Sequence, residues 1–123
     1  MDNSPGYIRH ADRIGKEEFI KLFTGEMKLE EWFSGNELAS HPFPRHAGSL
    51  AARYLVKKRI MDFFGNEILM KETEIMNDEY GKPEVILGEG IEQQMRKKGI
   101  GKIICSLSHS RNYAAAATVI FYK

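Results

Sequence analysis

Apolar and charged residues in the first half of the chain recur at helical spacing. Segment 15–33 sets large apolar residues among charges, which predicts one helix or two short helices around Gly25. Segment 40–46 is expected to be a loop, because two prolines two residues apart disfavour a helix. Segment 47–65 is rich in strong helix formers and ends at Gly65, which suits a left-handed cap. We therefore predict the longest helix there.

The second half of the chain is richer in strand patterns. Mixed alternation predicts a strand over 67–78, a turn over 79–83 and a short strand over 83–87. A polar helix is expected over 88–101, closed by one of its last glycines, Gly99 or Gly101. Residues 102–123 predict two strands of about 7 and 10 residues. Helices early and strands late indicate an α+β fold, with one long central helix packed on a largely antiparallel sheet.

Composition narrows the class of protein. A chain of 123 residues can bury about two-thirds of its unfolded surface, so we expect a single domain over 1–123. The single cysteine, Cys105, excludes an intrachain disulfide and a multi-cysteine zinc site, and fits a reducing compartment. The first residues form no apolar leader, and the longest apolar run, 114–122, is too short to span a membrane. We expect a cytoplasmic protein with no membrane partner.

The charge distribution is uneven although the net charge is only +1. Segment 95–102 is basic and segment 71–79 is acid-rich, so a basic patch can face an acidic partner. The lysines are not interleaved with aromatic residues on one evident face, so nucleic acid is not an expected partner.

Two cations fall on the apolar side of the central helix. On a helical wheel, Arg53 and Lys57 lie one turn apart inside the stripe that contains Leu50 and Ile60. A charge on a buried face must be paired or must reach water, because an isolated buried charge is too costly. Two interpretations stay open: an anionic ligand supplies the counter-charge, or both side chains extend along the core edge to water or local carboxylates.

Near the C-terminus, three hydroxyls and one imidazole stand beside the break between the last two strands. These are Ser106, Ser108, His109 and Ser110. Such groups can donate hydrogen bonds to phosphate oxygens while the strand backbone fixes their positions. The alternative is an ordinary turn histidine with local hydrogen bonds.

Three segments in order carry a family resemblance that covers roughly residues 33–123. "FSGNELASHPFPRHAGSLAARYLVKKRI" (33–60), "NDEYGKP" (77–83) and "SLSHSRNYAAAATVI" (106–120) resemble the motifs of the holo-acyl-carrier-protein synthases. This family is a group of 4'-phosphopantetheinyl transferases. The resemblance implies transfer of the phosphopantetheine arm from coenzyme A to a serine of an acyl or peptidyl carrier protein. It also implies an α+β fold and a homotrimer with sites between subunits.

By the same resemblance, Arg53 and Lys57 would contact coenzyme A phosphates, and Lys82 would lie near the nucleotide. Ser108, His109 and Ser110 would hold the ligand. Lys57, Lys58 and Glu37 are the candidate catalytic residues, with Glu37 as general base, although a helix-surface carboxylate is the plainer interpretation of that residue. Arg13 would contact the acidic face of the carrier protein, and Arg9 and Lys16 can extend the basic patch around Arg13.

The chain departs from the family where the family binds magnesium. The positions of the two metal-binding carboxylates are here Tyr7 and Lys58, so we predict no metal ligand, and Mg²⁺ is expected from the family alone. Lys58 either neutralises the pyrophosphate itself or pairs with Asp62 one turn later. Two other functions stay open: a catalytically inactive paralogue that binds a carrier protein or transferase subunit, and an unrelated domain for a small anion.

Overall fold

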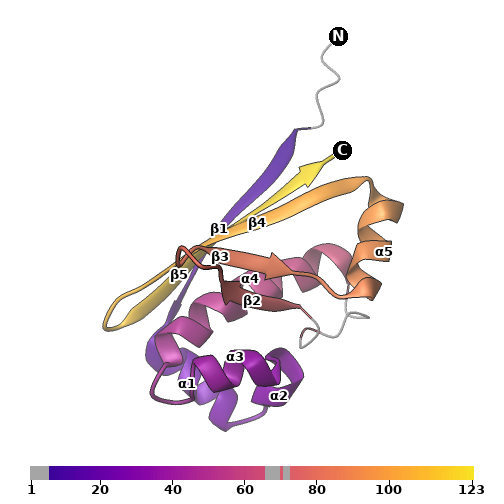
Figure 1. Ribbon diagram of the computed structural model, residues 1–123. Coiled ribbons are helices and arrows are strands. Elements are labelled where there is room, and N and C mark those ends of the chain that lie inside the picture. Colours follow the sequence, from indigo (N-terminus) through magenta and orange to yellow (C-terminus); the bar gives the residue numbers. More distant parts are fainter. Residues whose placement is uncertain (1–5, 66–69, 71–72) are drawn as a thin grey trace.

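The computed structural model describes residues 6–65, 70 and 73–123 of the chain. Its described elements are mixed helices and antiparallel strands, so the predicted α+β class is confirmed. Figure 1 shows α1, α2 and α3 gathered at one end of the fold, while the start of β1 and the end of β5 lie together at the other end. Among the described residues, no helix is both long and apolar enough to cross a membrane.

The main sheet has three antiparallel strands in the order β1, β5, β4. They are β1 (Tyr7–Gly15), β4 (Ile100–His109) and β5 (Tyr113–Tyr122). Strand pairing places Ala114, Ala116 and Ile120 on the inner face, where all three are buried. The other face of the sheet is called the outer face below. A smaller antiparallel sheet pairs β2 (Glu74–Asn77) with β3 (Pro83–Ile86).

The central helix, α4 (Ala47–Phe64), covers the inner face of the main sheet. Its buried Leu50, Val56 and Ile60 belong to one apolar core with the inner residues of the strands. The buried alanines of β5 have small side chains, so the helix and the sheet can pack closely against each other in the core. The predicted central helix on an antiparallel sheet is therefore confirmed.

The predicted helical segment 15–33 forms two helices, α1 (Lys16–Thr24) and α2 (Leu29–Trp32), with Gly25 at the end of the first. Their aromatic residues pack together: the ring centroids of Phe19 and Phe23 are 4.7 Å apart. A further short helix, α3 (Gly35–Ser40), starts with a capping box in which Ser34 and Glu37 exchange hydrogen bonds.

The two helix-ending glycines differ. α5 (Glu89–Lys98) ends at Gly99, whose φ of 71° and ψ of 28° are left-handed, as predicted for that glycine. Gly65 also has a positive φ, 98°, but its ψ of 170° is extended. The prediction of a left-handed cap at Gly65 is therefore wrong in ψ, although the positive φ still favours glycine.

Strand boundaries differ most from the sequence-based expectations. β1 was not predicted, because its inner positions mix two isoleucines with a histidine and an aspartate. β4 begins at Ile100, earlier than expected. Of the strand predicted over 67–78, β2 covers only 74–77, and residues 66–69 and 71–72 lie outside the described part. The predicted turn over 79–83 is present, with the Asp78 carboxylate accepting the backbone N–H groups of Tyr80 and Lys82.

Candidate functional site

Arg53 is held inside the protein by neutral acceptors. Its side chain is 3% exposed. Nε donates to the Ile75 carbonyl at 2.8 Å, Nη1 to the Ser49 carbonyl at 3.1 Å and Nη2 to Oδ1 of Asn77 at 3.3 Å. Within the described ranges, Arg53 forms no salt bridge. Burial lowers the pKa of the guanidinium, an effect that Glu37 partly opposes. The positive charge of Arg53 is thus hydrogen-bonded but not neutralised by a direct ion pair.

His109 lies directly on the first turn of α4. Its Nε2 is 3.3 Å from the Ser49 hydroxyl. A Cβ added to Gly48 would lie only 2.8 Å from Nδ1 of His109, so the absence of a side chain at Gly48 allows this approach. The same position is near the Cε atom of Lys16, at 3.2 Å. The end of the hairpin is therefore packed against a helix N-terminus, where the backbone N–H groups favour an anion.

Two further histidines complete a polar cluster that we call the histidine corner: His41, His46, Ser49, Arg53 and His109. The rings of His41 and His46 have centroids 6.0 Å apart, and His46 is the residue just before α4. The pKa of His41 is lowered to about 4, mainly by burial and then by the charges of Arg53, His46 and His109. The lowered pKa keeps His41 neutral near pH 7, so the guanidinium of Arg53 is the positive charge that would attract an anion to this corner.

The hairpin does not gather all its polar groups on one side. Ser108 pairs with Ala115 on the outer face, whereas His109 pairs with Ala114 on the inner face. Ser106 shares the outer face with Ser108, and Ser110 is exposed beyond the strand, with its backbone N–H donating to the Tyr113 carbonyl. The expectation of a single hydroxyl and imidazole cluster is wrong within one chain, because neighbouring strand residues point to opposite faces.

Lys57 occupies a closed internal ion pair. Lys57 and Glu37 are both 0% exposed, and Nζ donates to Oε1 of Glu37 at 2.5 Å. The other Nζ donors reach the carbonyls of Trp32 at 2.7 Å and Met70 at 3.2 Å. Burial lowers the pKa of the Lys57 ammonium, and Glu37 partly reverses that shift. All three ammonium donors are used, so the structure corrects the expectation that Lys57 contacts a coenzyme A phosphate or the reacting atoms.

Glu37 is equally unavailable as a general base. Its Oε1 also accepts the Ser34 N–H, and its Oε2 accepts the Ile75 N–H at 2.9 Å. A general base must come within hydrogen-bond reach of the substrate proton, and a fully buried carboxylate in an ion pair does not. The structure corrects both interpretations of Glu37, as general base and as surface carboxylate. It links α3, α4 and β2 instead.

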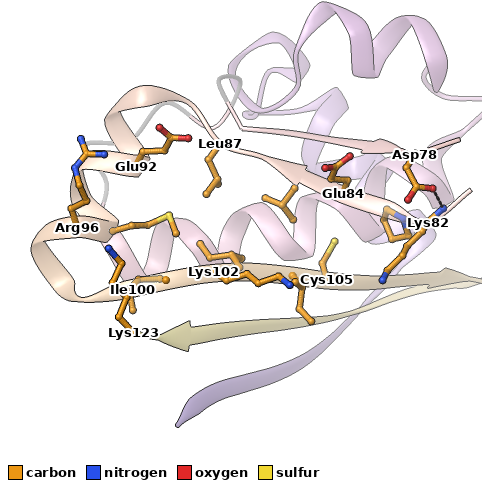
Figure 2. A pocket seen from close by; sticks show the side chains of 16 residues that line it. Asp78, Lys82, Glu84, Leu87, Glu92, Arg96, Ile100, Lys102, Cys105 and Lys123 are labelled. Atoms are coloured by element: carbon orange, nitrogen blue, oxygen red, sulfur yellow. Dashed lines mark hydrogen bonds between the residues drawn. The ribbon is translucent and has the colours of Figure 1, made fainter. Parts of the chain in front are cut away.

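Lys82 lines a cavity of about 610 Å³, which we call the larger cavity, between β3, α5 and β4. Figure 2 shows Lys82 at one end of this cavity and Arg96 at the other, with Lys102 on the strand between them. The volume is in the range of small-molecule sites. Asp78 and Cys105 also line it. Burial raises the pKa of Cys105 to about 11, and the charge of Arg53 opposes that shift. The cavity is linked to the histidine corner through Asn77, which accepts a hydrogen bond from Arg53 and directly precedes Asp78.

A second cavity of about 220 Å³, which we call the smaller cavity, lies between β1, α1 and α4. Lys58 lines it, as does Asp12, whose two carboxylate oxygens each accept a hydrogen bond from Arg59 at 2.8 Å. That bidentate pair lowers the pKa of the Asp12 carboxyl. In the described part of the chain, no three or more metal-ligating side chains form a group that could hold a metal ion.

The three expected carrier-binding residues separate into two places. Arg9 and Arg13 are exposed and share the outer face of β1, where the Arg13 guanidinium carbon lies 3.9 Å above the Tyr113 ring. The side chain of Lys16 instead reaches Gly48 and the histidine corner. Sequence reasoning also missed Ser49, Asn77, His41 and His46, because only the folded loop and strand bring them to Arg53 and His109.

Comparison with known proteins identifies the family. No protein-family model matches the sequence. A holo-[acyl-carrier-protein] synthase from Fusobacterium nucleatum is 37% identical over 114 residues, covering 92% of this chain and 93% of the relative. One from Chlamydia caviae is 35% identical over 113 residues, covering 91% and 85%. The chain belongs to the holo-acyl-carrier-protein synthase family.

Solved structures of holo-acyl-carrier-protein synthases share the fold. A Chronobacterium ammoniagenes complex with coenzyme A has a TM-score of 0.78 at 20% identity, covering 96% of this chain and 98% of that chain. The Helicobacter pylori synthase in complex with coenzyme A has a TM-score of 0.73 at 21% identity, covering 92% and 99%. The resemblance inferred from the three motifs is therefore confirmed, as is the fold.

Proposed function

We propose that this chain transfers the 4'-phosphopantetheine arm of coenzyme A to a serine of an acyl or peptidyl carrier protein. The observation that carries the proposal is Arg53, a buried guanidinium held only by neutral acceptors beside His109 and the start of α4. A phosphate at the histidine corner would receive charge-assisted hydrogen bonds from Arg53 and would lie at the N-terminus of α4, which favours an anion. The named relatives act in this reaction class, and the two solved complexes contain coenzyme A.

The larger cavity suits the rest of the coenzyme. Its lining combines the cations Lys82, Arg96 and Lys102 with apolar side chains such as Ile103. Apolar side chains can pack against an adenine ring or a pantetheine chain, while lysine and arginine side chains can pair with phosphate groups. We therefore propose that coenzyme A runs from the histidine corner into this cavity, with Lys82 near its nucleotide.

Arg9 and Arg13 are the proposed contacts for the carrier protein. They are exposed on one face of β1, and their guanidinium groups can form bidentate pairs with the carboxylates of an acidic partner. Exposed pairs of this kind influence association rate and salt dependence more than raw affinity. Replacing both arginines by glutamate should slow carrier modification without weakening coenzyme A binding.

We also propose that copies of this chain associate through the outer face of β4 and β5, forming the homotrimer that the resemblance implied and leaving the edge strand β1, with Arg9 and Arg13, to the carrier protein. This part of the outer face carries apolar residues that are not fully buried: Ile104, Ala115, Ala117, Val119 and Phe121. The opposite orientations of Ser108 and His109 suit a hairpin that serves two subunits. Val119→Asp should reduce the molar mass measured by light scattering to that of one chain. An unchanged mass would contradict the proposed interface.

The function is tested by two measurements on one set of variants. Isothermal titration measures coenzyme A binding, and mass spectrometry follows the mass gain of an apo-carrier protein. His109→Ala should weaken binding by roughly ten- to a hundredfold, the worth of one or two charge-assisted hydrogen bonds. The matched control is His10→Ala, which changes a histidine of β1 outside the histidine corner.

Two results would redirect the proposal. Coenzyme A binding without any mass gain on the carrier would support the inactive paralogue that binds its partners as a scaffold. Absence of coenzyme A binding by the wild-type chain would refute the transferase proposal and favour a domain for another small anion.

A further inference from the structure

We propose that Lys58 takes the place of a divalent cation in this chain, so that coenzyme A is bound through its pyrophosphate without magnesium. The inference rests on the proposed function and its homotrimer: the larger and the smaller cavity lie beside opposite edge strands of the main sheet, so the coenzyme bound to one subunit would reach Lys58 of a neighbouring subunit. It concerns the smaller cavity, whose lining includes Arg13, with its guanidinium over the Tyr113 ring, and three acidic and two other basic residues: Asp12, Glu18, Asp62, Lys58 and Arg59.

The best-placed carboxylate of this cavity is already occupied. Both oxygens of Asp12 accept hydrogen bonds from Arg59, and the two side chains are 19% and 35% exposed. A magnesium ion needs near-octahedral oxygen coordination and usually one or two carboxylates. To use Asp12 it would have to displace a bidentate guanidinium and accept the nearby positive charge of Lys58. The donor set therefore does not fit the ion.

The two positions where the family has metal-binding carboxylates, Tyr7 and Lys58, cannot supply magnesium ligands either. Tyr7, which replaces the family aspartate, is 63% exposed and lies on the outer face of the sheet, with its ring centroid 5.8 Å from that of Phe121. A phenol is not among the carboxylate, carbonyl and water ligands that magnesium prefers. Lys58 replaces the family glutamate, and an ammonium cannot coordinate a cation at all.

Lys58 has the properties of a free anion contact. It is exposed on α4 while lining the cavity. Across residues 6–65, 70 and 73–123 it forms no salt bridge, so the predicted alternative of a pair with Asp62 is not formed. Its flexible four-carbon stem carries three donors that can follow a phosphate oxygen. A cation that follows the phosphate in this way stabilises the charge that develops during phosphoryl transfer.

In the transfer step, Lys58 acts only through its charge and takes part in no bond formation or proton transfer. The carrier serine oxygen bonds to the phosphorus that bears the pantetheine. The bond from that phosphorus to the bridging oxygen breaks, and its electron pair leaves with adenosine 3',5'-bisphosphate. The serine proton passes to water. The Lys58 ammonium neutralises part of the negative charge on the departing phosphate and remains protonated throughout.

The test separates this inference from the transferase proposal by using binding as its readout. Coenzyme A is titrated into the wild-type chain in buffer with EDTA and in buffer with magnesium, followed by calorimetry. We expect dissociation constants that agree within about twofold, since no ion takes part in binding. Lys58→Met should weaken binding roughly ten- to a hundredfold in both buffers, while Lys58→Arg should retain it. Lys28→Met, an exposed lysine before α2, is the matched control.

The outcomes are distinct. Wild-type binding that strengthens tenfold or more with magnesium would overturn the inference and leave the transferase proposal intact. Lys58→Met binding equal to wild type would also overturn it. No wild-type binding in either buffer would refute the proposed function itself, and this inference with it. Because Lys58 is exposed, thermal unfolding of its variants should match wild type, which separates lost contacts from lost fold.

Discussion

Replacing Glu37 by alanine should destabilise the protein strongly. The change removes one partner of the fully buried pair with Lys57 and three hydrogen bonds accepted by the carboxylate. It leaves a buried ammonium whose remaining contacts are the carbonyls of Trp32 and Met70. It also leaves the Ile75 N–H without this acceptor. The loss therefore affects α3, α4 and β2 together.

The expected cost follows from the burial of both charges. Removing one member of a buried ion pair costs about 3–5 kcal/mol, because the other charge is left uncompensated. Single domains of this size have a free energy of unfolding of about 5–15 kcal/mol, so the Glu37→Ala substitution would remove a large part of that stability. The corresponding fall in melting temperature is roughly 10–20 °C for a chain of this size.

Urea unfolding at one fixed protein concentration measures this cost, because oligomerisation would otherwise shift the apparent stability. Glu31→Ala, in exposed α2 sequence, should change the free energy of unfolding by less than about 0.5 kcal/mol. Glu37→Leu combined with Lys57→Met should recover much of the loss, since an apolar pair of similar volume needs no counter-charge.

Two results would refute the reasoning about this pair. One is a cost below about 1 kcal/mol for Glu37→Ala, which would mean that the ammonium reaches water. The other is a double variant as unstable as the single one. The double variant also tests the chemistry: once folded, it should still modify a carrier protein, because neither residue touches substrate in our proposal.

Three further predictions concern the histidine corner and its surroundings. Gly48→Ala should displace the His109 ring and weaken coenzyme A binding about tenfold in calorimetry, with urea unfolding little changed. The pKa of His41 is about 4 in the folded chain against 6.5 for the free group, so its contribution to stability is present above pH 6.5 and is lost as the pH falls toward 4. His41→Gln should flatten that pH dependence in urea unfolding. Cys105 is buried with a pKa raised to about 11, so iodoacetamide at pH 8 should label it in urea but not in buffer.

Local chemistry made parts of the fold predictable. The end of α4 at Gly65 and the turn around Gly81 are determined by residues within a few positions in the sequence, so they could be predicted. β1 was harder, because its inner face mixes isoleucine with His10 and Asp12, and Asp12 is tolerated there only through Arg59 from α4. That compensation is a tertiary contact, which periodicity does not reveal.

The site was predictable as a set of charges but not as a set of contacts. The helical wheel placed Arg53 and Lys57 on the buried side, and both are buried. Which of the two forms an ion pair inside the protein depended on Glu37, which lies outside the central helix and pairs with Lys57. The separation of Ser108 from His109 could have been inferred, since a period of two places adjacent strand residues on opposite faces.

The contact between Gly48 and His109 couples the residues that these two positions can hold in a chain that binds a ligand. A methyl group at 48 would displace the imidazole from the helix, so only glycine keeps the ring where it stands. A library randomised at both sites and selected for coenzyme A binding should therefore return glycine together with histidine, whereas selection for folding alone should leave the two positions independent.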